Sequence, residues 1–258
     1  TNEYTNIFKG KNLISIHGES IQKFVIGLKI NGKEVTPNLN RLVKQGMYFS
    51  NYYSQVSVGT SSDSEFTINT SLMPAKVGVA FVSYFDREYL TLPKLLKQLG
   101  YYNMSFHANK GDFWNRNSMY KSLGYDKFYD QKAFNIDETI GLGLSDKSFF
   151  RQLTPILKKE NDNHKNFYAT LIMLTNHTPF PDISKYSKDP LDLKMYVTEN
   201  GVTNSYPYLE GTVLGRYLQS VHYADEALGE LMEHLDKSGL LENTVIMFYG
   251  DHDARLSS

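Results

Sequence analysis

Apolar residues follow two different periods along this chain. Short runs rich in apolar residues, typical of strands, occur at residues 12–17, 101–106, 167–174 and 244–249. Between them, apolar residues recur every three or four positions, as on one face of a helix. Strands that alternate with helices predict an α/β fold, with a central, mostly parallel sheet and helices on both of its faces.

The longest helical pattern covers residues 212–236. One apolar stripe runs along it, made of Tyr217, Val221, Ala224, Leu228, Leu231 and Leu235. The polar residues off this stripe are Arg216, Gln219, Asp225, Glu226 and Glu233. A single apolar stripe of this kind predicts a helix that packs one side against the sheet.

Capping residues delimit the shorter helices. Thr36 and Pro37 begin a predicted helix at residues 37–45, and Ser145 begins one that runs to about residue 159. Further helices are predicted at residues 63–71, 92–99 and 115–123. Two further stretches complete the pattern. Residues 47–53 are aromatic and predict a strand. Residues 181–210 are polar and predict a long loop or flap.

Composition restricts the class of protein. Of 258 residues, 41 % are hydrophobic and the formal charge is −1, which excludes a disordered chain and argues against a nucleic-acid partner. No apolar run approaches the roughly 18 residues that span a bilayer. The absence of cysteine removes disulfides, thiolate metal sites and cysteine nucleophiles. Residues 1–10 are polar and predict a linker, followed by one domain over residues 11–258.

Polar side chains of ligand type follow four of the predicted strands. They are Glu19, His107, His177 and the pair Asp251 and His252. A single histidine after a strand is more often a hydrogen-bonded structural residue. Ligands of open α/β sheets bind at the carboxyl ends of the strands, so four such ends together predict a site.

Glu19, Asp251 and His252 are a candidate set of metal ligands. Two carboxylates and one imidazole combine hard and borderline donors, which suit Mn²⁺, Mg²⁺ or Zn²⁺. Taken alone, the Asp-His pair also fits a loop aspartate beside an exposed histidine.

Residues 59–65 form a candidate nucleophile loop because they place hydroxyl groups at a predicted helix N-terminus. The backbone N–H groups and the helix dipole there favour an incoming phosphate. A metal bound to the hydroxyl of Thr60 or Ser61 would lower its pKa and make it a nucleophile. The same residues also fit an ordinary helix N-cap.

Residues 107–116 offer an imidazole, an amide, the single tryptophan of the chain and a guanidinium. These groups belong to His107, Asn109, Trp114 and Arg116. Arginine is a natural bidentate partner of phosphate oxygens, and tryptophan packs on a carbon skeleton. The alternative is a surface loop with an arginine at the start of a helix.

In their order along the chain, these segments resemble the extracellular catalytic domain of the lipoteichoic acid synthase family. This family of glycerol-phosphate polymerases and glycolipid primases lies within the sulfatase and alkaline-phosphatase superfamily. The resemblance runs from Asn12 to His252. It is carried by residues 17–20 (HGES), 34–37 (EVTP), 60–66 (TSSDSEF), 113–116 (FWNR), 143–146 (GLSD), 174–180 (LTNHTPF) and 249–252 (YGDH).

The resemblance implies a metal-dependent phosphoglycerol transferase that uses one Mn²⁺-type ion. The hydroxyl nucleophile attacks phosphatidylglycerol, diacylglycerol leaves, and the glycerophosphoryl-enzyme passes its group to a glycolipid anchor or a growing lipoteichoic acid chain. The implied metal ligands are Glu19, Asp251, His252 and the hydroxyl of Thr60 or Ser61. The implied glycerophosphate contacts are His107, Asn109, Trp114, Arg116 and His177, the last also assisting proton transfer. The implied location is the extracellular face of a Gram-positive cell membrane, or the medium after release.

The chain departs from the family pattern at several positions. The family usually has Gly-Lys-Thr-Ser-Asp at the nucleophile, and an ungapped match puts Ser61, not Thr60, in the place of that threonine. Asn109 replaces a residue that is often aspartate. By comparison with the family, we expect this chain to lack the N-terminal membrane anchor and the C-terminal part of the domain. The sequence does not separate polymerase from primase.

Three other functions fit the same pattern less well. A sulfatase needs a Cys/Ser-x-Pro-x-Arg motif, which residues 61–65 lack. A phosphodiesterase or a phosphoethanolamine transferase would use the same metal and nucleophile on another substrate. A non-catalytic domain that binds a cell-wall polymer would have no need of an activated hydroxyl.

Overall fold

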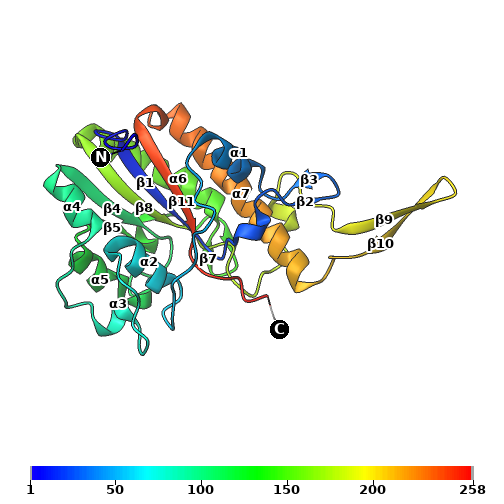
Figure 1. The fold of residues 1–258 in the computed structure, drawn as a ribbon, viewed down its shortest axis with the longest axis horizontal. Helices are drawn as coiled ribbons and strands as arrows, with labels where there is room; N and C mark the ends of the chain where they lie inside the picture. The colour runs from blue at the N-terminus through cyan, green and yellow to red at the C-terminus, as the bar shows by residue number, and fades with distance from the viewer. Residues whose placement is uncertain (1, 257–258) are drawn as a thin grey trace.

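The computed structural model describes residues 2–256, and a five-stranded sheet forms its centre (Figure 1). The strand order is β11 (Thr244–Gly250), β1 (Asn12–Gly18), β8 (Asn166–Ile172), β4 (Tyr101–Phe106) and β5 (Lys127–Tyr129). All four neighbouring pairs in this sheet are parallel. The predicted α/β fold is therefore confirmed, and the carboxyl ends of all five strands meet at one edge.

Helices cover both faces of the sheet (Figure 1). The helices against one face are α1 (Pro37–Gln45), α6 (Asp146–Asn163) and α7 (Val213–Lys237). The helices against the other are α2 (Ser61–Thr70), α3 (Ala80–Ser83), α4 (Leu92–Gln98) and α5 (Arg116–Leu123). Among residues 2–256, none of these helices has the length and apolar character that crossing a bilayer requires.

The two cores follow from the twofold side-chain period of the strands. Strand β8 is buried along its whole length. Its Phe167, Ala169 and Leu171 pack with α6 and α7, whereas Tyr168 and Ile172 pack with α2, α3 and α5. A strand buried on both faces is held rigidly, which fixes the loop at its carboxyl end.

Helix α7 is buried more widely than its apolar stripe predicts. Gln219 and Asp225 lie off the stripe, but both are buried, and each accepts a backbone hydrogen bond from another segment. Asp225 accepts hydrogen bonds from the backbone N–H groups of Asn38 (2.9 Å) and Leu39 (2.7 Å), in the first turn of α1. Thr36 instead donates its hydroxyl to the carbonyl of Val25 (3.1 Å), so the N-terminus of α1 is capped from another helix.

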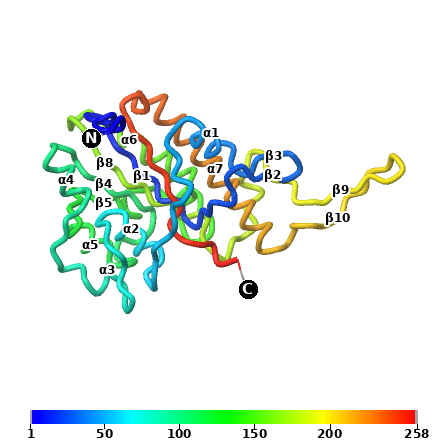
Figure 2. Tube along the Cα trace, in the orientation of Figure 1, coloured from blue at the N-terminus to red at the C-terminus, as the bar shows by residue number. Residues whose placement is uncertain are grey.

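The stretch at residues 181–210, predicted as a long loop or flap, has regular structure over about half of its length. It contains a hairpin of β9 (Lys194–Glu199) and β10 (Val202–Pro207), which projects from the body of the protein (Figure 2). The turn between the strands is Asn200-Gly201, with φ values of 50° and 81°. Asn-Gly is the preferred pair for such a turn, so the hairpin signal was present in the sequence.

The predicted strand at residues 47–53 is also wrong. The segment has no regular structure and its aromatic side chains are largely exposed. A strand needs a neighbour for its backbone groups. Within residues 2–256, β11 pairs only with β1, and residues 47–53 line the same cavity as β11 without pairing with it.

The remaining elements are short. They are β2 (Lys29–Ile30), β3 (Lys33–Glu34), β6 (Thr139–Ile140), β7 (Gly143–Leu144), and the 3-10 turns η1 (Lys23–Val25), η2 (Phe113–Asn115), η3 (Gln131–Ala133), η4 (Ser184–Tyr186) and η5 (Leu241–Asn243). Apart from η2, which leads into α5, they connect the larger elements without forming part of the candidate site.

Candidate functional site

The two central acidic residues come from opposite ends of the chain and meet because β1 and β11 are neighbours. Their register pairs Gly18 with Gly250, so Glu19 and Asp251 follow the two strands at the same level. Gly250 has to be glycine, since a Cβ there would lie 1.9 Å from the carbonyl oxygen of Ile21. The close approach of the two backbones brings the two carboxylates together.

Four of the predicted residues form one cluster. The Ser61 hydroxyl oxygen lies 3.3 Å from Glu19 Oε2 and 3.2 Å from His252 Nε2. That imidazole nitrogen is also 3.4 Å from Glu19 Oε1 and 3.2 Å from Asp251 Oδ2. The structure therefore brings together two carboxylates, an imidazole and a hydroxyl, all able to donate to one cation.

The charges of this cluster suit a divalent cation. Glu19 and Asp251 are buried, and buried carboxylates need compensating positive charge. Burial lowers the pKa of His252, but the hydrogen bond to Glu19 and the charge of Asp251 outweigh it and raise that pKa to about 9. A cation bound by these oxygen and nitrogen donors would take the place of the imidazole proton, so the residues fit a metal site.

His17 is a member of the site that the sequence analysis left without a role. It is fully buried, with Nε2 2.9 Å from Asp251 Oδ2 and Nδ1 3.1 Å from the Tyr249 hydroxyl. His17, Glu19 and Asp251 also each offer a ligand atom within 4.8 Å of one another. His17 can therefore orient Asp251 or serve as a ligand. The available signal was its position, two residues before Glu19 at the end of a strand.

The structure distinguishes the two candidate nucleophiles by position. Ser61 is the first residue of α2, and its side chain enters the cluster. Thr60 is the residue before the helix, with φ 42° and ψ −109°, and its side chain makes no capping hydrogen bond. A positive φ is costly for a β-branched residue, so the local fold holds Thr60 in strain while directing Ser61 inward.

The loop before Ser61 is closed by Asp63. Its Oδ2 accepts hydrogen bonds from the backbone N–H groups of Ser57 and Gly59, both at 2.9 Å. A Cβ on Gly59 would lie 2.4 Å from Asp63 Oδ1. The Gly-Thr-Ser-Ser-Asp sequence thus builds a tight turn that leads directly into α2.

Arg116 and His107 lie in a second buried group next to this cluster. The Arg116 guanidinium pairs with the Glu65 carboxylate, and the His107 Nδ1 lies 3.2 Å from the carbonyl oxygen of Ile172. Burial and the nearby Arg116 charge lower the pKa of His107 well below its usual value. His107 is therefore neutral at physiological pH, while Arg116 keeps its charge.

The other predicted substrate contacts have their own partners outside the Ser61 cluster. Trp114 is half-buried against the core between α2, α3 and α5, and Asn109 accepts a hydrogen bond from the N–H of Lys110 (2.7 Å). His177 Nδ1 lies 2.6 Å from the carbonyl oxygen of Thr178. Within residues 2–256, no hydrogen bond joins these three side chains to the Ser61 cluster.

The loop that carries His177 is anchored by Asp146, the first residue of α6. Its carboxylate accepts hydrogen bonds from the N–H groups of Leu174 (2.8 Å) and Thr175 (3.2 Å). Further along, Asn176 Nδ2 donates to the backbone carbonyl of Glu19 (2.8 Å). The carboxyl ends of β1 and β8 are thereby linked.

Asp146 also makes stability depend on pH. Burial raises its pKa from 3.8 to about 7, although its hydrogen bonds oppose the change. Between pH 4 and 7 the folded protein holds a proton that the unfolded chain releases, so this residue's contribution to stability decreases as pH rises. We expect Asp146→Asn to remove that decrease in urea unfolding experiments at several pH values. An identical pH slope in both proteins would contradict the assignment.

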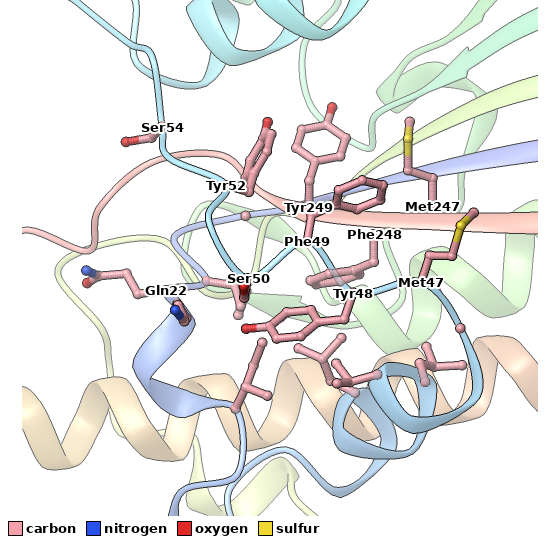
Figure 3. Close-up of a pocket in the computed structure, with 18 of the residues that line it drawn as sticks. Gln22, Met47, Tyr48, Phe49, Ser50, Tyr52, Ser54, Met247, Phe248 and Tyr249 are labelled. Atoms are coloured by element: carbon pink, nitrogen blue, oxygen red, sulfur yellow. The ribbon is translucent and has the colours of Figure 1, made fainter. Parts of the chain in front are cut away.

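A cavity of about 530 Å³ adjoins the site beside β11. Figure 3 shows Tyr48 and Tyr52 of the irregular segment lying beside Phe248 and Tyr249 of the strand. The lining is largely apolar and reaches His252 and Asp253. His252 thus lies at the border between the cluster and this cavity.

Comparison with known proteins identifies the family. Residues 11–258 match the family model described as Sulfatase, and the chain belongs to this family. It is similar to lipoteichoic acid synthase 1 of Bacillus subtilis (39 % identity over 257 residues) and to lipoteichoic acid synthase of Staphylococcus aureus (42 % over 256 residues). Each match covers 97 % of this chain but only 37 % of the relative.

Solved structures agree with the fold. The lipoteichoic acid synthase LtaP from Listeria monocytogenes superposes with a TM-score of 0.87 at 35 % identity, covering 97 % of this chain and 58 % of that one. The Streptococcus pyogenes phosphoglycerol transferase GacH has a TM-score of 0.67 at 22 % identity, covering 97 % and 63 %. At that identity the second match concerns the fold alone.

Proposed function

We propose that residues 11–258 form the catalytic domain of a metal-dependent phosphoglycerol transferase, with residues 1–10 as a linker. It moves glycerophosphate from phosphatidylglycerol to a glycolipid anchor or a growing lipoteichoic acid chain at the extracellular face of a Gram-positive membrane. The observation that carries the proposal is the Ser61 hydroxyl, held at a helix N-terminus against Glu19 and His252. Similarity to lipoteichoic acid synthases supports the substrate.

The proposed reaction has two displacements at phosphorus. In the first, a bond forms between Ser61 Oγ and the phosphorus of phosphatidylglycerol, the bond to the diacylglycerol oxygen breaks, and that oxygen takes up a proton as the serine hydroxyl loses one. In the second, an acceptor hydroxyl loses its proton and bonds to the phosphorus, the bond between phosphorus and Ser61 Oγ breaks, and Ser61 Oγ regains a proton. The N-terminus of α2 stabilises charge on the phosphate oxygens in both.

Glu19, Ser61, Asp251 and His252 would hold the metal, for which Mn²⁺ is our first choice over Mg²⁺ or Zn²⁺. When bound, this cation supplies a Lewis acid that lowers the pKa of the coordinated hydroxyl. Arg116 and His107 are proposed to bind the phosphate, with Trp114, Asn109 and His177 closing over the glycerol. His17 is proposed to keep Asp251 oriented through its 2.9 Å contact.

The donor lipid tests this function. With Mn²⁺ present, we expect the protein to release diacylglycerol from phosphatidylglycerol at least about tenfold faster than from phosphatidylethanolamine. The reason is that the site is proposed to contact the glycerol headgroup of the donor lipid. Lipid extraction followed by mass spectrometry measures both products. Preference for phosphatidylethanolamine or for a soluble phosphodiester would favour the two alternative enzymes instead. Metal binding without turnover of any of these would favour a polymer-binding domain.

A further inference from the structure

Helix α2 carries a buried carboxylate one turn after Ser61. Glu65 lies four positions further along the helix, and residues with this spacing share one face. Its exposed fraction is 1 %, against 7 % for Ser61. A carboxylate that deep in the protein needs partners for both of its oxygens.

Both oxygens of Glu65 are bound by residues of α5. Oε1 accepts hydrogen bonds from Arg116 Nε (3.1 Å) and Nη2 (2.5 Å), and Oε2 accepts one from the Tyr120 hydroxyl (2.5 Å). The pair is enclosed, with Arg116 only 2 % exposed. Such an arrangement leaves the guanidinium little freedom to rotate.

One edge of the guanidinium is left without a partner. Arg116 Nη1 is buried and has no hydrogen-bond partner among the residues that the structure describes. A buried N–H group without an acceptor is costly, and a charged one more so. The neutral His107 lies near Arg116, but among the described residues no hydrogen bond joins it to Nη1.

We propose that Glu65 is a positioning residue: it holds Arg116 by Nε and Nη2 so that Nη1 remains to donate to a phosphate oxygen of the glycerophosphate group. Ser61 and Glu65 belong to the same rigid helix. The distance between the nucleophile and the phosphate-binding arginine is therefore set by α2. This inference rests on the function proposed above and adds a determinant of phosphate placement to it.

Binding of glycerol phosphate to the intact chain tests the role of Glu65. Glu65→Asp keeps the charge but withdraws the carboxylate by one methylene, so the guanidinium moves. We expect the Kd for glycerol phosphate, measured by calorimetry with Mn²⁺ present, to rise about ten- to hundredfold while thermal unfolding stays cooperative. Lys121→Gln, on the exposed side of α5, is the matched control and should bind as the unchanged protein does.

Two further variants separate positioning from a purely structural role. Glu65→Asp combined with Arg116→Ala should bind no more weakly than Arg116→Ala alone, because both changes act through one contact. Tyr120→Phe removes the hydroxyl contact to Glu65 but leaves the ion pair, and should raise the Kd about threefold, which keeps the test valid if Glu65→Asp does not fold.

The possible results have distinct meanings. The positioning role is overturned if folded Glu65→Asp binds glycerol phosphate with unchanged affinity, or if the losses in the double variant are additive. Where Glu65→Asp does not fold, unchanged affinity in Tyr120→Phe overturns it. Each of these results leaves the proposed transferase function intact. If the unchanged protein does not bind glycerol phosphate, the proposed function fails and the role of Glu65 fails with it.

Discussion

Ser61→Ala is expected to abolish release of diacylglycerol from phosphatidylglycerol, with a loss of at least about a thousandfold. The substitution removes only the hydroxyl group, and the oxygen of this group lies between Glu19 and His252. Metal binding should persist at reduced affinity, because the two carboxylates and the imidazole remain. Product release with and without the substitution is measured on the same lipid vesicles.

Thr60→Ala is the matched variant for this experiment. It removes a hydroxyl from the adjacent residue, which makes no capping hydrogen bond. We expect activity within about tenfold of the unchanged protein, with the loss arising from altered strain in the turn. If Thr60→Ala is inactive and Ser61→Ala is active, the assignment of the nucleophile is reversed.

Glu19→Ala is expected to lower the affinity for Mn²⁺ by more than about a hundredfold. Outer residues of metal sites already cost 10- to 100-fold when removed, and Glu19 is proposed to bind the ion directly. Calorimetry or metal analysis after dialysis gives the stoichiometry, which should be one ion for the unchanged protein. The measurement does not depend on turnover.

An exposed glutamate provides the control for metal binding. The Glu88 side chain is fully exposed and contacts Lys94, so Glu88→Ala should leave both stoichiometry and affinity unchanged. Retention of full Mn²⁺ affinity in Glu19→Ala would contradict the assignment of Glu19 as a ligand. His17, which offers a ligand atom in the same group, would then be the next candidate.

Four of the five strands of the sheet could be predicted because each carries its own local signal, whereas the three-residue strand β5 was missed. The strands before His107 and before Asp251 were found from apolar runs that end in polar residues. The order of the strands in the sheet could not be predicted, because no local sequence signal pairs β1 with β11. The geometry of Glu19 against Asp251 depends on that pairing.

The failures have a common physical cause. Residues 47–53 have high strand propensity, but a cavity lies between them and β11 and they do not pair with it, so tertiary context overrides propensity. Asp225 was grouped with the polar side of its helix, yet it is buried because it caps α1. The sequence placed Glu65 in a serine-rich helix start but did not indicate its contact with Arg116, which lies in another helix. Contacts between distant segments determine all three.

The most direct test of the account is the mass of the protein after incubation with phosphatidylglycerol and Mn²⁺, followed by peptide mapping. The account predicts a glycerophosphoryl group on the peptide that contains residues 59–65, attached to Ser61, and no such group without metal. An adduct on a residue outside this segment would contradict the account. So would a protein that binds Mn²⁺ and releases diacylglycerol but carries no glycerophosphoryl group when the reaction is quenched without acceptor.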